Sequence, residues 1–122
     1  MREVWMSIKK NRLYLDVGQV ESARMESVLQ EIGTACDQLV YGFTCVPIFH
    51  KSNVVGPDNE DFILKVQDLL YSKGCSRVVR VREKDMDLVQ RQYEMVSLKH
   101  GYEIEYAESL EEAEAILDNT TD

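Results

Sequence analysis

The chain has 122 residues, 44% of them hydrophobic, and this length and composition suit one domain with one core. It carries 22 acidic and 14 basic residues, and the resulting net charge of −8 would repel the negative phosphates of nucleic acid. No apolar run is long enough to cross a bilayer, and the first residues lack the apolar core of a signal peptide. We therefore expect a cytoplasmic protein that neither binds nucleic acid nor inserts into a membrane. Residues 1–122 are predicted to form a single domain whose last few residues are disordered.

The first predicted element is a β-hairpin. Apolar residues alternate with more polar ones on both sides of a polar turn at residues 9–12. The alternating positions are Val4, Met6 and Ile8 before the turn and Leu13, Leu15 and Val17 after it. This pattern predicts a hairpin over about residues 3–18, ended by Gly18.

A helix and a buried strand are predicted next. Apolar residues at helical spacing predict a helix over roughly residues 21–39, in which Gly33 is a weak point. The apolar run at residues 43–49 then predicts a buried strand. Because Pro47 has no N–H to donate to a neighbouring strand, we expect either a bulge or a local loss of pairing there.

The second half of the chain repeats the order of helix and strand. A helix is predicted after a polar loop, with Asp58 or Asn59 as its cap and Gly74 as its end. Residues 77–82 predict the following strand.

Two further helices and a strand complete the pattern. A third helical face runs from about residue 85 to Gly101, and the alternation of apolar residues over 102–106 predicts the last strand. Residues 109–112, with the sequence Ser-Leu-Glu-Glu, form a capping box, so a final helix is predicted to start at about residue 110.

These elements predict an α/β fold. The N-terminal hairpin is followed by repeated β-α units, giving about five strands and four helices in a β-α superhelix. The sheet is expected to be mostly parallel, because a helical crossover is the connection that parallel neighbours require.

The cysteines indicate a reducing environment. Cys36, Cys45 and Cys75 are odd in number and lie in apolar stretches without CxxC spacing. That pattern favours reduced thiols packed in the core over disulfides or a zinc site. We expect no metal and no cofactor.

The element order and two short motifs resemble the STAS family, which includes the anti-sigma-factor antagonists and the tails of sulfate transporters. Residues 50–59 are similar to the family's strand-to-helix loop, typically Asp-Leu-Ser followed, several residues later, by Asp-Ser at the helix start, and Ser52 and Asp58 fall at matching positions. Residues 101–117 resemble the end of small stand-alone bacterial members. The resemblance spans roughly residues 4–118 and implies a STAS-like domain that docks a protein partner through this loop.

The chain departs from the family at the regulatory position. In the antagonist branch a kinase phosphorylates the Ser after the loop Asp, and the added charge blocks docking. Asn59 stands at that position here, and an amide does not accept phosphate in this chemistry. His50 and Lys51 replace the family's Asp and its apolar neighbour. The resemblance therefore implies docking without the usual switch.

Two specific functional interpretations of this loop, a metal site and a general base, are less well supported than ordinary structural roles for the same residues. Asp58, Glu60 and Asp61, with His50 nearby, offer ligands for a divalent metal, but acidic residues in a first helical turn are better explained by the helix dipole. No Ser or Cys in a recognisable nucleophile motif accompanies His50, so a solvated histidine at a strand end is favoured over a general base.

Arg80 and Arg82 share one face of their predicted strand and, with Lys84, approach a loop that leads into a helix. This arrangement would suit an anion bound near a helix N-terminus. The plain alternative, which we favour, is a set of surface arginines paired with the abundant carboxylates.

The sequence thus predicts a non-enzymatic interaction module whose docking loop includes Ser52, Asp58 and Asn59 and whose partner is a protein such as an anti-sigma or kinase-like regulator. The alternative is an anion or small-ligand sensor at the strand-end crevice near Arg80 and Arg82. A third reading is a small enzyme without a recognisable catalytic set. An exposed edge on the last predicted strand would favour a homodimer.

Overall fold

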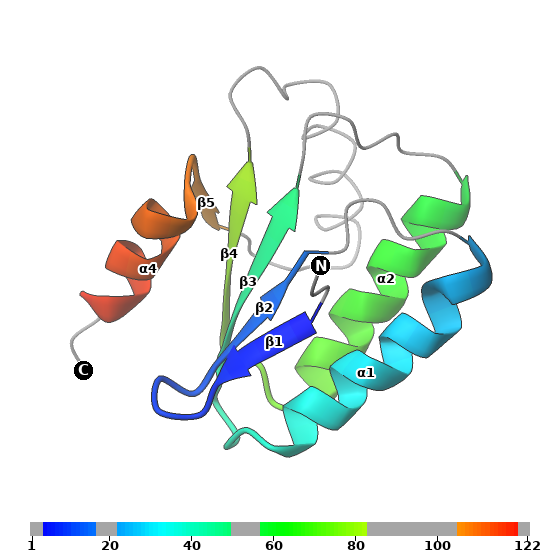
Figure 1. Cartoon of the computed structure of the whole chain (residues 1–122), viewed down its shortest axis with the longest axis horizontal. Coiled ribbons are helices and arrows are strands. Elements are labelled where there is room, and N and C mark those ends of the chain that lie inside the picture. Colours follow the sequence, from blue (N-terminus) through cyan, green and yellow to red (C-terminus); the bar gives the residue numbers. More distant parts are fainter. Residues whose placement is uncertain (1–3, 17–21, 50–56, 83–104, 120–122) are drawn as a thin grey trace.

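A five-stranded sheet lies between helices in the computed structural model of the protein, which describes residues 4–16, 22–49, 57–82 and 105–119 (Figure 1). Within these ranges the side chains of residues 22, 49, 57–60 and 82 are not described. The elements in chain order are β1 (Val4–Ser7), β2 (Arg12–Leu15), the 3-10 helix η1 (Ser22–Arg24), α1 (Met25–Asp37), β3 (Thr44–Phe49), α2 (Pro57–Ser72), β4 (Arg77–Arg82), β5 (Glu105–Ala107) and α4 (Leu110–Asp118).

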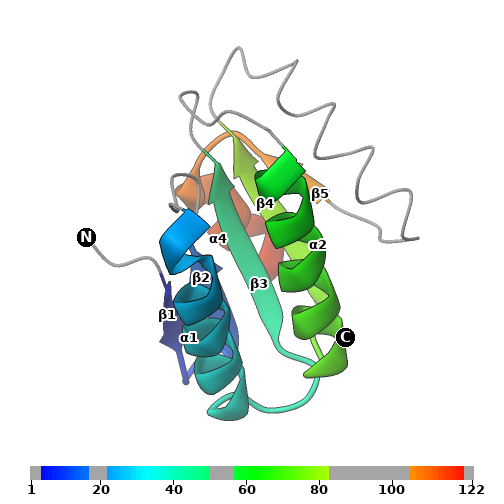
Figure 2. The same ribbon diagram turned by 90° about the vertical axis from the view of Figure 1, so that its right-hand side faces the viewer.

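The strands lie in the sheet in the same order as in the chain, β1-β2-β3-β4-β5. β1 runs antiparallel to β2, and the remaining neighbours are parallel. Because parallel crossovers have one hand and both step in the same direction, α1 and α2 lie on the same face of the sheet (Figure 2). α4 follows the last strand, has no crossover to make, and covers the opposite face (Figure 1).

This arrangement confirms the predicted α/β class and the mostly parallel sheet of five strands. The described ranges contain three α-helices where four were predicted for the whole chain. The helix predicted from about residue 85 to 101, and the first part of the strand predicted at 102–106, lie outside the described residues.

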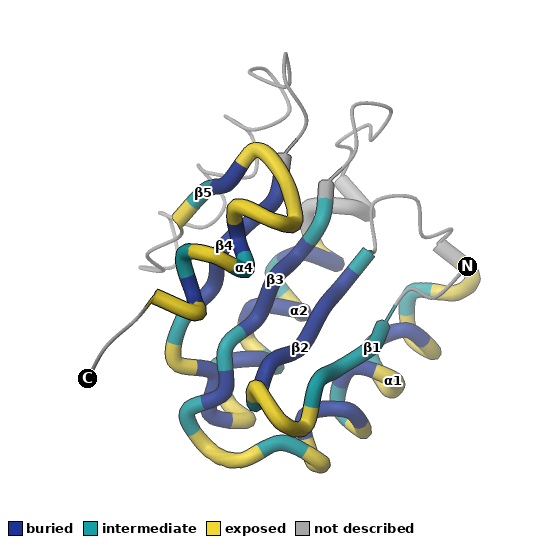
Figure 3. Tube along the Cα trace, turned by 60° about the vertical axis from the view of Figure 1, so that its left-hand side comes forward, coloured by how far each residue is buried: buried dark blue, intermediate teal, exposed yellow. Residues whose placement is uncertain are grey.

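Strand alternation divides the apolar residues into two clusters, one on each face of the sheet. The cluster under α1 and α2 is centred on Leu13, Leu15, Val28, Ile32, Phe43, Cys45, Phe62, Val66, Leu70 and Val78. The cluster under α4 is centred on Tyr14, Val46, Val79, Val81, Ala107, Ala113 and Leu117. Figure 3 shows the resulting band of buried residues through β2, β3 and β4. Full burial of one such aliphatic or aromatic side chain contributes about 1.5–3 kcal/mol.

The predicted hairpin is confirmed, but its turn lies one residue earlier than expected, at residues 8–11 between the end of β1 at Ser7 and the start of β2 at Arg12. Arg12 was assigned to the polar turn, yet it is the first residue of β2 and only 4% exposed. The turn ends instead at Asn11, which has a φ of 52°. Asn11 tolerates this conformation, and its side-chain amide donates to the Val40 carbonyl at 3.1 Å while its Oδ1 accepts from the Val40 N–H at 2.8 Å.

Pro47 lies inside the sheet without a bulge. β3 pairs with β4 at Cys45↔Val78 and again at Ile48↔Val81, in the same register on both sides of the proline. The two pairs between them are missing, so the local loss of pairing is the correct alternative and the bulge is wrong. On its other side Pro47 stays in register with Leu15 of β2.

The helix ends follow the predicted signals with small shifts. The first helix is shorter than residues 21–39, because residues 22–24 form a 3-10 turn and α1 ends at Asp37. Gly74 ends α2 with a φ of 99°, and its N–H donates to the Tyr71 carbonyl while the Cys75 N–H donates to the Leu70 carbonyl. These two bonds form a Schellman motif, which needs a residue that adopts positive φ without strain.

α4 begins at Leu110, as the capping box predicts. The hydroxyl of Ser109 accepts from the Glu112 N–H at 3.1 Å. The Glu112 carboxylate accepts from the N–H of Glu108 at 3.3 Å, one residue earlier than in the usual reciprocal box.

Candidate functional site

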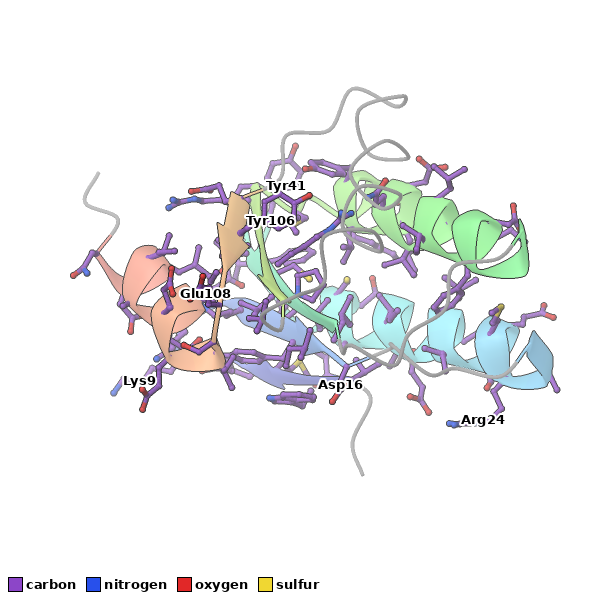
Figure 4. All side chains as sticks on the ribbon, turned by 90° about the horizontal axis from the view of Figure 1, so that it is seen from above. Lys9, Asp16, Arg24, Tyr41, Tyr106 and Glu108 are labelled. Atoms are coloured by element: carbon purple, nitrogen blue, oxygen red, sulfur yellow. The ribbon has the colours of Figure 1, made fainter. Side chains whose placement is uncertain are left out.

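The four parallel strands, β2 to β5, have their carboxyl ends at the same end of the sheet, which we call the carboxyl edge. In register, Leu15 of β2 lies beside Pro47 of β3, Phe49 of β3 beside Arg82 of β4, and Val81 of β4 beside Ala107 of β5. Asp16 follows β2 and Glu108 follows β5 at this carboxyl edge (Figure 4). Ligand and docking sites of parallel sheets are built at this edge, where loops lead into helices.

The predicted docking loop starts at this edge. β3 ends at Phe49, and in the sheet it lies between β2 and β4. His50 and Ser52 lie outside the described residues. Phe49 and Arg82 are register partners, so the start of the docking loop and the backbone of Arg82 come from adjacent strand ends.

The start of α2 corrects the predicted cap. The helix begins at Pro57, so the backbones of Asp58 and Asn59 already belong to its first turn. A proline at the first helical position is favourable, because its fixed φ fits the helix and its missing N–H would have had no partner there. An acidic residue in the first turn is favoured by the helix dipole, and Asp58 holds such a position.

One acidic residue of the disfavoured metal-site alternative, Asp61, has a neighbouring ion-pair partner. The Asp61 carboxylate lies 3.1 Å from the Lys65 ammonium, one turn later on the same exposed face of α2. Among the residues that the structure describes, no three His, Cys, Asp or Glu side chains are grouped to hold a metal ion.

Arg80 is buried, which contradicts the expectation of a surface arginine. Only 2% of it is exposed, and strand alternation places it with Val78 on the face covered by α1 and α2. Its register partner in β5 is Tyr106. Arg80 has interaction partners, as a buried charge requires. Arg82, two residues on, shares that face of the strand, but its side chain is not described.

The sequence patterns missed an ionic network around the buried Arg12. It lies at the amino ends of the parallel strands, which we call the amino edge. Arg12 donates to the Glu114 carboxylate at 2.8 Å and to the Asp118 carboxylate at 3.0 Å. Tyr14 donates its hydroxyl to Glu114 at 2.6 Å, and Lys10 contacts the other oxygen of Glu114 at 2.9 Å. One available signal was the i, i+4 spacing of Glu114 and Asp118, which places both carboxylates on one face of a helix.

The network fastens α4 to the hairpin. Burial by itself would raise the pKa of Glu114, but hydrogen bonds from Tyr14, Lys10 and Arg12 outweigh it and lower that pKa to about 2. A second pair, Arg77 with Glu105, joins β4 to β5 near the same edge. All these charged groups have partners within the fold, so at the amino edge they hold neighbouring elements together.

The predicted packed thiols are confirmed. Cys36, Cys45 and Cys75 are free and buried in the cluster under α1 and α2. Burial raises the pKa of Cys36 to about 11 and that of Cys75 to about 12, and it raises the pKa of Cys45 well above its usual value. Thiols with such pKa values are poor nucleophiles at neutral pH.

A groove of about 780 Å³ lies between β1 and α1. Its walls are Val4, Trp5 and Met6 of β1 and residues of α1 from Ser27 to Gln38. The groove therefore lies beside β1, at the other end of the strand order from β4, and away from the crevice predicted near Arg80 and Arg82. The sequence patterns did not indicate it, because they do not show which strand lies at an edge.

Comparisons of the chain with protein-family models, with curated proteins and with solved structures find no match. None of the helices in the described ranges has both the length and the apolar character needed to cross a membrane.

Proposed function

We propose that this protein is a non-enzymatic protein-interaction module of STAS-like architecture that docks a partner through residues 52–59 and the first turn of α2. One observation carries the proposal. β3 is the central strand of the sheet and ends at Phe49, three residues before this segment, where all four parallel strands end. A loop that follows such a strand end is presented on a rigid scaffold, as an interaction loop needs to be.

The amino edge of the sheet supports the same proposal by contrast. Its charged side chains are engaged in the pairs of Arg12 with Glu114 and Asp118 and of Arg77 with Glu105. The first turn of α2 is acidic in sequence, with Asp58, Glu60 and Asp61, the last of which pairs with Lys65 on the same helix. The partner proposed from the family resemblance is an anti-sigma or kinase-like regulator, and such a partner would offer a complementary basic surface.

The test is a binding measurement on three variants at one position. Asn59→Glu introduces charge where the family carries phosphoserine, and Asn59→Gln is the matched neutral control. Candidate partners captured from the native host are purified and titrated by calorimetry. We expect Asn59→Glu to weaken binding at least tenfold, about 1.4 kcal/mol, and Asn59→Gln to bind nearly as well as the parent.

The third variant tests the switch. A kinase that acts on the family should not modify the parent chain at position 59, whereas it should phosphorylate Asn59→Ser, and mass spectrometry locates the phosphate. Stoichiometric phosphate on Ser52 of the parent would show that the switch has moved. Equal binding by the parent and Asn59→Glu would exclude docking at this loop.

A second candidate is an anion sensor at the same edge. The observation in its favour is that Arg82 ends β4 beside the end of β3, two residues after the buried Arg80. A helix N-terminus and a guanidinium together suit a phosphate. Titration with inorganic phosphate, followed by thermal shift, is expected to stabilise the parent but not Arg82→Gln if this function is correct. Arg82→Gln is preferred to a change at Arg80, because Arg80 is part of the packed interior.

A further inference from the structure

β1 is an edge strand with a groove along its outer side. It is the first strand in the sheet order, and among the described strands it pairs only with β2. Successive strands of a sheet lie about 4.8 Å apart and bond through backbone N–H and C=O groups. Along its outer side β1 presents a row of such groups over the four residues Val4–Ser7, facing the groove that α1 bounds on the other side.

The two walls of the groove differ in chemistry. β1 is half-buried, and its side chains alternate between the two faces of the sheet: Val4 and Met6 pack on the face covered by α1, whereas Trp5 lies on the opposite face, where it stacks on Tyr14 with ring centroids 5.5 Å apart and planes 8° from parallel. The α1 wall is polar and includes the exposed Glu31. α1 contains three acidic residues, Glu26, Glu31 and Asp37, and no basic residue from Met25 to Asp37.

We propose that this groove binds an extended polypeptide segment of a partner protein, which pairs with β1 as an additional strand and places a Lys or Arg against Glu31. The strand edge supplies the main-chain bonds, Trp5 on one face of the sheet packs against the apolar side chains of every second residue, and Glu31 on the other face selects the charge of the residues between them. The net charge of −8 favours a basic segment over an acidic one at longer range.

A second copy of the chain fits this groove less well. Antiparallel pairing of two β1 strands about a two-fold axis keeps both α1 helices on the same face of the joined sheet and brings them side by side. Each α1 would then bring its Glu31, the acidic residue of α1 among the described groove walls, towards the Glu31 of the other copy, and α1 has no basic residue between Met25 and Asp37. Like charges in close juxtaposition oppose such an interface.

The described walls of the groove come from β1, α1 and the residue after α1, and this inference does not depend on the proposed docking loop. The test uses the full chain and a displayed library of eight-residue peptides, with Val, Ile or Phe at every second position and any polar residue elsewhere. Selection is carried out on the parent, on Glu31→Lys and on Glu26→Lys. The last variant is the matched control, because Glu26 is exposed on the same helix but does not line the groove.

The expected result is enrichment of Lys or Arg at one register position on the parent and on Glu26→Lys, and of Asp or Glu at that position on Glu31→Lys. A selected peptide made without Trp should change the fluorescence of Trp5, the single tryptophan of the chain. N-methylation of the alternate peptide amides that face the ladder should weaken its binding at least tenfold.

Three outcomes overturn the proposal. The first is an absence of enrichment, or the same enrichment on all three proteins. The second is binding that is unaffected by N-methylation on either set of alternate amides. The third is a dimer of the parent in sedimentation equilibrium that Met6→Asp converts to a folded monomer, since a second copy would then occupy the groove.

Discussion

At the scale of single residues, the charge of Arg12 is the least expected feature of the interior. It is only 4% exposed, and it stays charged because Glu114 and Asp118 both accept its hydrogen bonds. Removing one partner of such a group costs more than the intact network contributes, because the other charge is left buried. The network therefore fixes the position of α4 on the hairpin.

Acid should weaken this network in a defined pH window. The folded pKa of Glu114, about 2, is below its ordinary value of 4.5, so its contribution is complete above pH 4.5 and disappears as the pH falls towards 2. Each pKa unit corresponds to about 1.4 kcal/mol, and the side chain is 25% exposed, so we expect about 1–3 kcal/mol. Urea unfolding of the parent and Glu114→Gln should differ by this amount at pH 7 and converge near pH 2. Glu111→Gln, on the exposed side of α4, should follow the parent, and identical curves for all three would contradict the assignment.

Two glycines should respond oppositely to alanine. Gly74 has a φ of 99°, and a Cβ there would lie 2.4 Å from the ring of Tyr41, so Gly74→Ala should lose about 1–3 kcal/mol. Gly33 lies inside α1, where a Cβ would meet only Leu69 at 4.0 Å, so Gly33→Ala should gain about 0.4–1 kcal/mol. Thermal unfolding measures both. The double variant Tyr41→Ala/Gly74→Ala separates the two costs at Gly74. The stability that it loses relative to Tyr41→Ala alone measures backbone strain, and the remainder of the Gly74→Ala loss measures the clash with Tyr41.

At the scale of elements, the patterns that predicted structure best are those whose cause is local. Residues 77–82 form β4 as predicted, and Ser109 caps α4, because strand alternation and helix capping depend on neighbouring residues alone. The burial of Arg12 and Arg80 depends on which elements cover each face, and sequence spacing does not contain that information. The groove beside β1 was missed for the same reason. Of the predicted site, the loop position at the strand ends follows from topology, whereas the side chains of Asp58 and Asn59 are not described.

The two helix starts should differ in their sensitivity to alanine. Ser109 is a true N-cap, since its hydroxyl accepts from the Glu112 N–H, and Ser109→Ala should lose about 0.5–2 kcal/mol. Asp58 lies inside the first turn of α2, so Asp58→Ala should lose only the dipole contribution, about 0.3–1 kcal/mol. Denaturant unfolding of both variants gives the comparison. A clearly larger loss for Asp58→Ala would mean that its side chain makes a cap that the helix boundary does not indicate.

At the scale of the whole molecule, the sheet joins two cores of different composition. The cluster under α1 and α2 holds all three thiols, whereas the cluster under α4 is smaller and is bordered by the ionic network. Both clusters share the central strands β2, β3 and β4, so they are expected to unfold together.

The thiols allow this cooperativity to be measured. Cys36 lies in α1, Cys45 in β3 and Cys75 in the turn after α2, so together they sample three elements of one core. With pKa values of about 11 for Cys36 and about 12 for Cys75, and a still more buried Cys45, the native chain should react with iodoacetamide at pH 8 at least about 100-fold more slowly than the unfolded chain. Mass spectrometry across a urea series should then show all three thiols becoming reactive at one midpoint, equal to that measured by circular dichroism. Labelling of Cys36 at lower urea than Cys45 would instead show that α1 detaches first, and the groove between α1 and β1 would then belong to a part of the fold that opens separately from the sheet.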